Sequence, residues 1–207
     1  RVDFTVVNAR TTQPLDARVA ITEGQRQPVE FLGRHTFFTE LDRKGRLQAS
    51  MAPGSYGFTV SSGGGFLGPN QAETLDVRPG ETATSKVALT RLFDPPASGW
   101  YSADLHHHAD QAEGVTPPEY LARSQLAAGL DLLFVSDHDS MANHAPLQKI
   151  ADARGVPFIP SIELSPSWGH FNAWPVRPGQ QLEIDTATAN IDEVFGEARR
   201  LGAIVVQ

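Results

Sequence analysis

The stretch Leu130-Asp131-Leu132-Leu133-Phe134-Val135-Ser136-Asp137-His138 decides how the second half of the chain is folded. Its short apolar run is typical of a strand that is buried on both faces of a parallel sheet, and it ends in a carboxylate and an imidazole. A helix is predicted on each side of it, over residues 116–128 and 145–154, and a glycine follows each helix. This alternation predicts βα units and a parallel sheet.

Two further predicted strands end in residues of the same kind. Residues 99–103 are strand-like and lead into Asp104-Leu105-His106-His107-His108, and the strand 156–162 leads into Glu163. Alternate side chains of a strand point to one side, so Asp104, His106 and His108 are expected to project together while His107 faces away. In βα barrels the chemistry lies at the carboxyl ends of the strands. Imidazoles and carboxylates that meet there predict a site for a divalent metal.

Downstream of Glu163 the pattern predicts one more helix and one more strand. The helix covers residues 190–201, with apolar residues spaced for one face, and Gly202 ends it before a buried strand at 203–206. A (β/α) barrel needs about 200 residues or more, whereas residues 99–207 number 109. We therefore expect the chain to carry about half of a barrel, with the remaining half supplied by the same natural chain.

The first half of the chain has a different pattern. Short alternating segments separated by turn residues such as Pro53-Gly54 and Pro79-Gly80 predict a small antiparallel β-sandwich over residues 1–93. The stretch Leu47 to Tyr56, which contains Ala-Pro-Gly-Ser before a strand, resembles the carboxypeptidase-regulatory or prealbumin-like sandwiches attached to extracellular enzymes. A linker is predicted at 94–99, and the barrel half at 100–207.

Composition narrows the function classes. The chain has 207 residues, no cysteine and a net charge of −7. Residues 1–98 carry 11 Lys/Arg against 10 Asp/Glu, and residues 99–207 carry 6 against 14. The acidic second half disfavours a broad nucleic-acid surface. The sequence contains no run of 18 apolar residues, so no membrane span is predicted in it. No signal peptide is present, so we expect any such peptide to have been removed or to lie outside this chain.

The ligand-type residues, taken in order, resemble the PHP (polymerase and histidinol phosphatase) superfamily, and among its members the CehA/McbA-like metallohydrolases, in which a β-sandwich often precedes the PHP domain. The resemblance covers roughly residues 99–207. It implies a distorted seven-stranded (β/α)7 barrel holding two or three divalent metals, usually zinc, manganese or iron. Its motifs here are Asp104-x-His106-x-His108, Asp137-His138, Glu163 and His170.

The resemblance also implies a role for each of these residues. His106 and His108 would hold the first metal, Glu163 would bridge it to a second, and His170 would bind the second. His138 would serve a third metal, while Asp104 and Asp137 would orient the histidines from outside. Many members carry a further histidine or acid after the first motif. Here Asp110 or Glu113 would have to substitute for it, and the last ligands of the family would lie beyond Gln207.

The predicted activity is metal-dependent hydrolysis by a metal-bridging hydroxide. The bond is a carbamate, ester or amide, towards which the CehA-like resemblance tilts, or a phosphoester. We expect a small-molecule substrate, no nucleic-acid or membrane partner, and an extracytoplasmic location, periplasmic or secreted. The sequence contains no Gly-x-Ser-x-Gly elbow, so a serine nucleophile is not needed.

Three alternatives remain open. His106-x-His108-x-Asp110-Gln111 is one residue short of the metallo-β-lactamase HxHxDH pattern, but that fold needs a β-sandwich around the motif. An amidohydrolase-type barrel usually bridges its metals with a modified lysine, and Lys149 is the only lysine after the linker. A non-catalytic metal- or carbohydrate-binding module is the third. His144 is either a substrate contact or a surface residue, and Trp168 and Trp174 either pack or wall the substrate.

Overall fold

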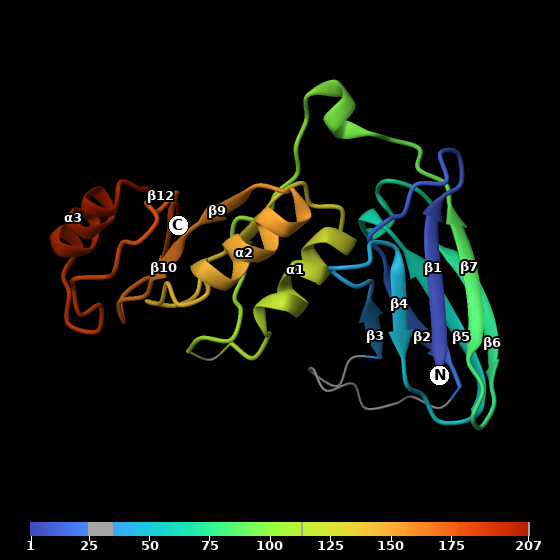
Figure 1. Cartoon of the computed structure of the whole chain (residues 1–207). Coiled ribbons are helices and arrows are strands. Elements are labelled where there is room, and N and C mark those ends of the chain that lie inside the picture. The colour runs from blue at the N-terminus through green and yellow to red at the C-terminus, as the bar shows by residue number, and fades with distance from the viewer. Residues whose placement is uncertain (25–34, 113, 207) are drawn as a thin grey trace. The chain divides into compact units, whose positions relative to one another are not determined.

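The computed structural model (Figure 1) describes residues 1–24, 35–112 and 114–206. The chain forms two compact units, one of Arg1–Ser102 with Ala122–Leu130 and the other of Ala103–Leu121 with Asp131–Gln207. The predicted linker at 94–99 contains a single 3-10 turn, Pro95–Ser98, and its role as a domain boundary stays a prediction. None of the helices in the described ranges is long and apolar enough to cross a membrane.

Two sheets that share one apolar core build the first unit. The three-stranded sheet has the order β4-β1-β7, and the four-stranded sheet has the order β3-β2-β5-β6. The strands are β1 Val2–Asn8, β2 Arg18–Glu23, β3 Thr36–Phe38, β4 Arg46–Ala49, β5 Gly54–Ser61, β6 Gln71–Val77 and β7 Ala83–Leu89. Five of them lie where the sequence predicts strands, and β3 and β4 are additional.

One pair of strands corrects the prediction of a purely antiparallel sandwich. β1 and β7 run parallel, with Val2 opposite Ala83 and Asn8 opposite Leu89. β6 pairs with β5 in the other sheet. The turn that contains Pro79-Gly80 therefore carries the chain from one sheet to the other, and β7 enters beside β1 instead of closing a hairpin with β6.

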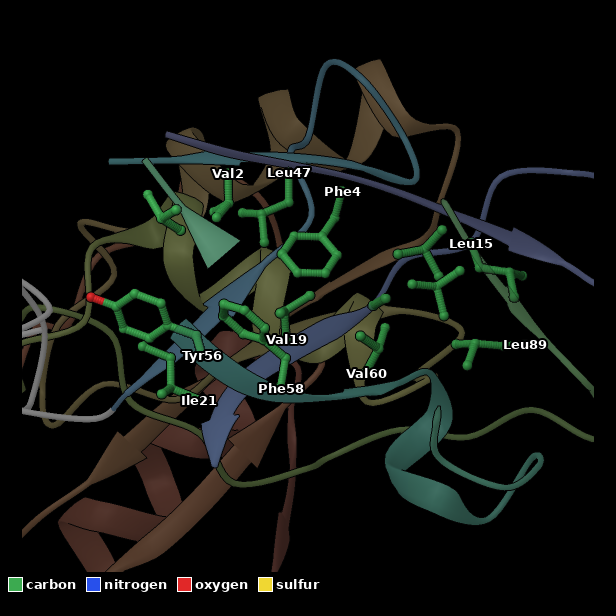
Figure 2. Close-up of a cluster of buried hydrophobic side chains, with 14 residues drawn as sticks. Val2, Phe4, Leu15, Val19, Ile21, Leu47, Tyr56, Phe58, Val60 and Leu89 are labelled. Carbon is green, nitrogen blue, oxygen red and sulfur yellow. The ribbon is translucent and has the colours of Figure 1, made fainter. Parts of the chain in front are cut away.

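Alternate residues of the facing strands fill the space between the two sheets, as Figure 2 shows. The ring of Phe4 on β1 meets the ring of Phe58 on β5 edge-on, with their centroids 5.2 Å apart. Tyr56 stacks on Phe58 at 6.0 Å, and its hydroxyl donates to the carbonyl of Ala52. The core thus satisfies its one large polar group while it keeps the aromatic rings away from water.

The second unit contains one βα unit of the predicted kind. Strand β8 (Leu133–Val135) is followed by helix α2 (His144–Arg154) and by strand β9 (Phe158–Pro160), which pairs with β8 in parallel. Helix α1 (Pro118–Ala127), most of which belongs to the first unit, precedes β8 and ends near Gly129, as predicted. Gly129 has φ +81°, a conformation that a residue with a Cβ adopts only with strain.

The remaining strands overturn the prediction of a parallel sheet throughout. β10 (Ile162–Leu164), β11 (Phe171–Trp174) and β12 (Ile204–Val206) form an antiparallel sheet with β11 in the middle. No strand is predicted at β11, which is too short to carry a clear pattern. β12 is half exposed and not buried as predicted, because its alternate residues face opposite sides of the sheet, with Val205 turned to the core and Ile204 and Val206 exposed. A continuous half barrel is not seen in the described residues.

The segment before the histidines is also not a strand. Residues 99–103 have no ladder partner, and Trp100 and Tyr101 are 74% and 71% exposed. Individual hydrogen bonds tie this segment to Ser136, the residue that follows β8. The amide of Ser136 donates to the carbonyl of His107 at 2.7 Å, and the amide of His107 donates to the Ser136 hydroxyl at 3.1 Å. The histidines are therefore placed by an irregular segment and not by a strand end.

Helix α3 (Ile191–Leu201) covers the face of the antiparallel sheet that turns away from the histidines. A capping box formed by Asn190 and Glu193 starts it, and Gly202 ends it where the sequence predicts. Val194, Ala198 and Leu201 are buried as expected, whereas Ile191 at the helix start is exposed. The face of β10 that packs against this helix is the apolar one.

A buried carboxylate holds α3 to the loop before it. Glu197 accepts a hydrogen bond from the backbone amide of Glu183 at 2.8 Å and binds the guanidinium of Arg200 through both oxygens, at 2.6 and 2.7 Å. The hydrogen bond from Arg200 lowers the pKa of Glu197 below its ordinary value of 4.5, against the opposing effect of burial. A depressed pKa means that the ionised form stabilises the fold above about pH 4.5, and that this stability is lost as the pH falls through the pKa of the folded state.

Glu197→Gln is therefore expected to lower the free energy of unfolding at pH 7 by about 1–3 kcal/mol, the cost of spoiling a buried polar contact. The difference from the unmodified protein should shrink as the pH is lowered from 5 to 3. Urea unfolding at several pH values measures it, with Glu81→Gln, a change at an exposed side chain, as the control. A difference that stayed constant over that pH range would contradict this role.

Candidate metal centre

Glu163 lies at the centre of the site because of the register of β10. Its neighbours Ile162 and Leu164 point into the apolar core under α3, so alternation turns Glu163 to the opposite face of the sheet. Glu163 lies opposite Asn172 in the ladder with β11. The Glu163 residue is only 2% exposed, and a buried carboxylate requires charged or hydrogen-bonding partners.

Four imidazoles supply those partners. Oε2 of Glu163 lies 2.9 Å from Nε2 of His106, 3.0 Å from Nε2 of His108 and 3.1 Å from Nε2 of His138. Oε1 lies 2.9 Å from Nδ1 of His170. The structure thus brings together the five residues predicted as metal ligands from four separate segments, and their role as ligands stays a prediction.

The five residues form two overlapping groups that could each hold a cation. One group is His106, His108 and Glu163, and the other is His138, Glu163 and His170; within each, the ligand atoms lie within 4.8 Å of one another. Nε2 of His106 and Nε2 of His108 are 3.1 Å apart. Two imidazole nitrogens bound to one tetrahedral zinc at about 2.0–2.1 Å lie about 3.3 Å apart. The donor types and their spacing therefore fit a divalent metal.

The two groups are open on one side. The side chains of His106 and His170 are 54% and 50% exposed, whereas those of His108 and His138 are 28% and 21% exposed. One histidine of each group therefore lies at the surface and the other lies deeper, beside the buried carboxylate. Catalytic metal sites differ from structural ones in keeping such an open position.

The imidazoles also determine the charge of Glu163. Burial by itself raises the pKa of this carboxyl group, but the hydrogen bonds from His106 and His170 and the charges of His106 and His138 outweigh burial. The net result is a pKa below the ordinary value. Glu163 is accordingly held as a carboxylate, which is the form that binds cations.

The two predicted outer-shell carboxylates differ in what they contact. Oδ2 of Asp104 lies 3.1 Å from Nδ1 of His107, and Oδ1 of Asp104 accepts from the backbone amide of His106 at 3.1 Å. His107 turns away from the metal groups, as predicted. The prediction that Asp104 projects with His106 and His108 is wrong in this structure, because that segment is not a strand.

The side chain of Asp137 holds the histidine segment by binding the backbone of that segment. It is buried, its Oδ1 accepts from the amide of Ala109 at 2.6 Å, and its Oδ2 accepts from Nδ2 of Asn143 at 2.7 Å. Asn143 also donates to Oδ1 of Asp110 at 2.9 Å. Asp110 therefore has a partner other than a metal, and Glu113, the other suggested substitute ligand, lies outside the described residues. Asn143 is a residue that the sequence reasoning missed.

Backbone hydrogen bonds between β10 and the segment that follows β8 align the remaining ligands. The amide of Glu163 donates to the carbonyl of Asp137 at 3.1 Å, and the amide of Asp139 donates back to the carbonyl of Glu163 at 2.9 Å. Asp139 has φ +49°, a left-handed conformation that Asp tolerates better than most residues. Its side chain accepts from the amide of Ser165 at 3.1 Å. His138 is thereby turned towards Glu163.

Other side chains near the site have structural partners. Nε2 of His144 lies 2.7 Å from the carbonyl oxygen of Ser161, and burial lowers the pKa of this imidazole, so the alternative that His144 contacts substrate gains no support. Trp168 donates to the carbonyl of Ala189 at 3.0 Å and packs on Phe171. Lys149, on which the amidohydrolase alternative depends, is exposed on α2.

Known proteins are similar to parts of this chain. No family model matches the chain. A 3',5'-nucleoside bisphosphate phosphatase of Chromobacterium violaceum is 39% identical over 105 residues, which are 48% of this chain and 36% of that protein. A 5'-3' exoribonuclease of Haemophilus influenzae is 32% identical over 65 residues, 31% of this chain and 24% of that protein. The chain thus spans about a third or less of the length of these curated relatives.

These sequence matches support the resemblance to the PHP superfamily. They do not extend to the narrower CehA/McbA-like subgroup. Among solved structures, a two-domain protein from Bacteroides vulgatus, described as containing a predicted PHP-like metal-dependent phosphoesterase, aligns with a TM-score of 0.44 and 21% identity. That alignment covers 51% of this chain and 34% of the other.

Proposed function

We propose that the chain is part of a PHP-type, metal-dependent hydrolase that cleaves phosphoester bonds in small molecules. The observation that carries the proposal is Glu163, a buried carboxylate with imidazole nitrogens 2.9–3.1 Å from its oxygens. Four imidazoles around one carboxylate are far more than a structural ion pair needs. They are the donors that zinc, manganese and iron share.

The chain's own residues have distinct tasks in this proposal. Glu163 would be shared by both metal groups, with His106 and His108 completing one and His138 and His170 completing the other. A divalent cation supplies Lewis acidity towards a phosphoryl oxygen and lowers the pKa of a coordinated water. Asp137 fixes the histidine segment, and the exposed sides of His106 and His170 leave room for a substrate to approach.

The choice of a phosphoester rests on the relatives. One is named as a phosphatase and the other as an exoribonuclease, and both names describe hydrolysis of a phosphoester. This support outweighs the tilt towards a carbamate, ester or amide that the CehA-like resemblance gave. A carbamate or carboxyl ester is kept as the second candidate because the same metal chemistry acts on a carbonyl carbon.

A substrate panel tests the proposal. The metal-stripped full-length natural protein, of which this chain is proposed to be a part, is assayed with added Zn²⁺ or Mn²⁺ on p-nitrophenyl phosphate, bis-p-nitrophenyl phosphate, adenosine 3',5'-bisphosphate, p-nitrophenyl acetate and 1-naphthyl N-methylcarbamate. We expect hydrolysis of at least one phosphoester, dependent on added metal, with kcat/KM at least about tenfold above that for the carbamate. Faster turnover of the carbamate or acetate would select the second candidate, and no metal-dependent hydrolysis at all would refute both.

A further inference from the structure

A buried asparagine connects two carboxylates beside the candidate metal centre. Asn143 is 4% exposed, and its Nδ2 lies 2.7 Å from Oδ2 of Asp137 and 2.9 Å from Oδ1 of Asp110. Both partners are carboxylates, and an ionised carboxylate only accepts hydrogen bonds. The orientation of the amide is therefore determined, because its NH2 group must face the two acids.

The position of Asn143 in the sequence indicates a different role, which the structure does not support. Asn143 immediately precedes α2, where asparagine is a preferred helix cap. Its side chain makes no capping hydrogen bond there, whereas Asn190 before α3 caps two backbone amides. The amide of Asn143 is thus turned from the helix to the carboxylates.

The contacts of Asn143 lead directly to the metal ligands. Oδ1 of Asp137 accepts from the amide of Ala109, which directly follows His108. Asp110 is the next residue along. Asn143 therefore holds both the side chain of Asp110 and the acid that binds Ala109, and this irregular segment has no strand ladder to fix it. Without an NH2 group between them, the two carboxylates would repel each other.

We propose that Asn143 is a positioning residue that holds Asp110 and Asp137 together and so sets the geometry of His106 and His108 for metal binding. This inference rests on the proposed function only for its metal; the effect on the segment is independent of any ligand. Residues that orient metal ligands from outside typically change metal affinity by about 10–100-fold when they are replaced.

Asn143→Asp is the sharpest test, since it keeps the size of the side chain and its preference for a helix start while removing both donors. In the metal-stripped protein, hydrogen exchange of the Ala109 amide should become at least about tenfold faster. Affinity for Zn²⁺ alone, measured by competition with a chelating dye, should fall by about 10–100-fold. The melting temperature is recorded in parallel, so that a general loss of stability is visible.

Two further variants make the result decisive. Asn190→Asp is the matched control, because Asp caps α3 equally well and lies apart from this network, so Zn²⁺ affinity and Ala109 exchange should not change. The double variant D137N/N143D exchanges the amide and the acid, which again gives Ala109 an acceptor and gives position 143 a donor partner. In this double variant the Ala109 amide should exchange more slowly than in Asn143→Asp.

The outcomes separate this inference from the proposed function. Unchanged Ala109 exchange and Zn²⁺ affinity in Asn143→Asp would overturn the inference, as would equal effects in Asn190→Asp. If Asn143→Asp did not fold, failure of D137N/N143D to restore Ala109 protection would overturn it. If the unmodified protein bound Zn²⁺ but hydrolysed nothing, only the proposed function would fall. If it bound no metal, Ala109 exchange would still decide whether Asn143 positions the segment.

Discussion

Glu163→Gln is expected to remove metal binding from both groups at once. Glutamine has nearly the same shape, but it replaces the carboxylate with a neutral amide whose NH2 would face imidazole nitrogens 2.9–3.1 Å away. Glu163 belongs to both metal groups. The loss should therefore exceed the roughly 100-fold upper range seen for residues outside the ligand shell, and hydrolysis should fall at least as far.

Zn²⁺ and Mn²⁺ titration measures the binding, and the far-ultraviolet circular dichroism spectrum shows whether the fold is kept. We expect the fold to be kept because Ile162 and Leu164, which anchor β10 in its apolar core, are unchanged. Glu119→Gln, at an exposed position at the start of α1, is the control and should bind metal as before. Normal metal binding by Glu163→Gln would show that the carboxylate is not the shared ligand.

The residues that form the site could be predicted from the sequence because only a few types of side chain suit a cation. His106, His108, His138, Glu163 and His170 all come together; the first four were chosen because their side chains suit a cation and follow an expected strand, and His170 because the resemblance to the PHP superfamily implies it. The local structure that positions these residues differs from the predicted one, however. His106 and His108 are placed by hydrogen bonds from His107 and Ala109 to residues at the end of β8, and not by strand alternation.

The parts that could not be predicted depend on contacts distant in sequence. β11 has four residues, and its place between β10 and β12 is specified by the strands on either side. A pattern within four residues is too short to distinguish a strand from a loop. The parallel pairing of β1 with β7 likewise depends on a crossing between two sheets that no local signal records.

Asn143 shows why the support around a site is harder to foresee than its ligands. An asparagine before a helix has an ordinary explanation as a cap, and nothing in the neighbouring residues argues against it. Only the folded structure shows that its NH2 group faces Asp110 and Asp137. Asp104 illustrates the reverse case, since its side chain was expected to project with those of His106 and His108, but its Oδ2 lies beside His107 and its Oδ1 accepts from the backbone amide of His106.

His106→Ala and His170→Ala should separate the two metal groups. Each variant removes a ligand from only one group, because His106 belongs with His108 and His170 belongs with His138. We expect each single variant to lose one bound Zn²⁺ and to keep the other, and the double variant to lose both. Turnover should fall by about 10²–10³-fold in each, the typical effect of removing one stabiliser of transition-state charge.

Native mass spectrometry and elemental analysis count the metal in each variant, with His35→Ala in the sandwich unit as the control that should keep its full content. The two groups share Glu163 and differ in their histidines. Oε1 faces His170, while Oε2 faces His106, His108 and His138. If either single variant lost all of its metal, the two groups would be one site that shares a single cation. If both kept all of it, neither histidine would be a ligand.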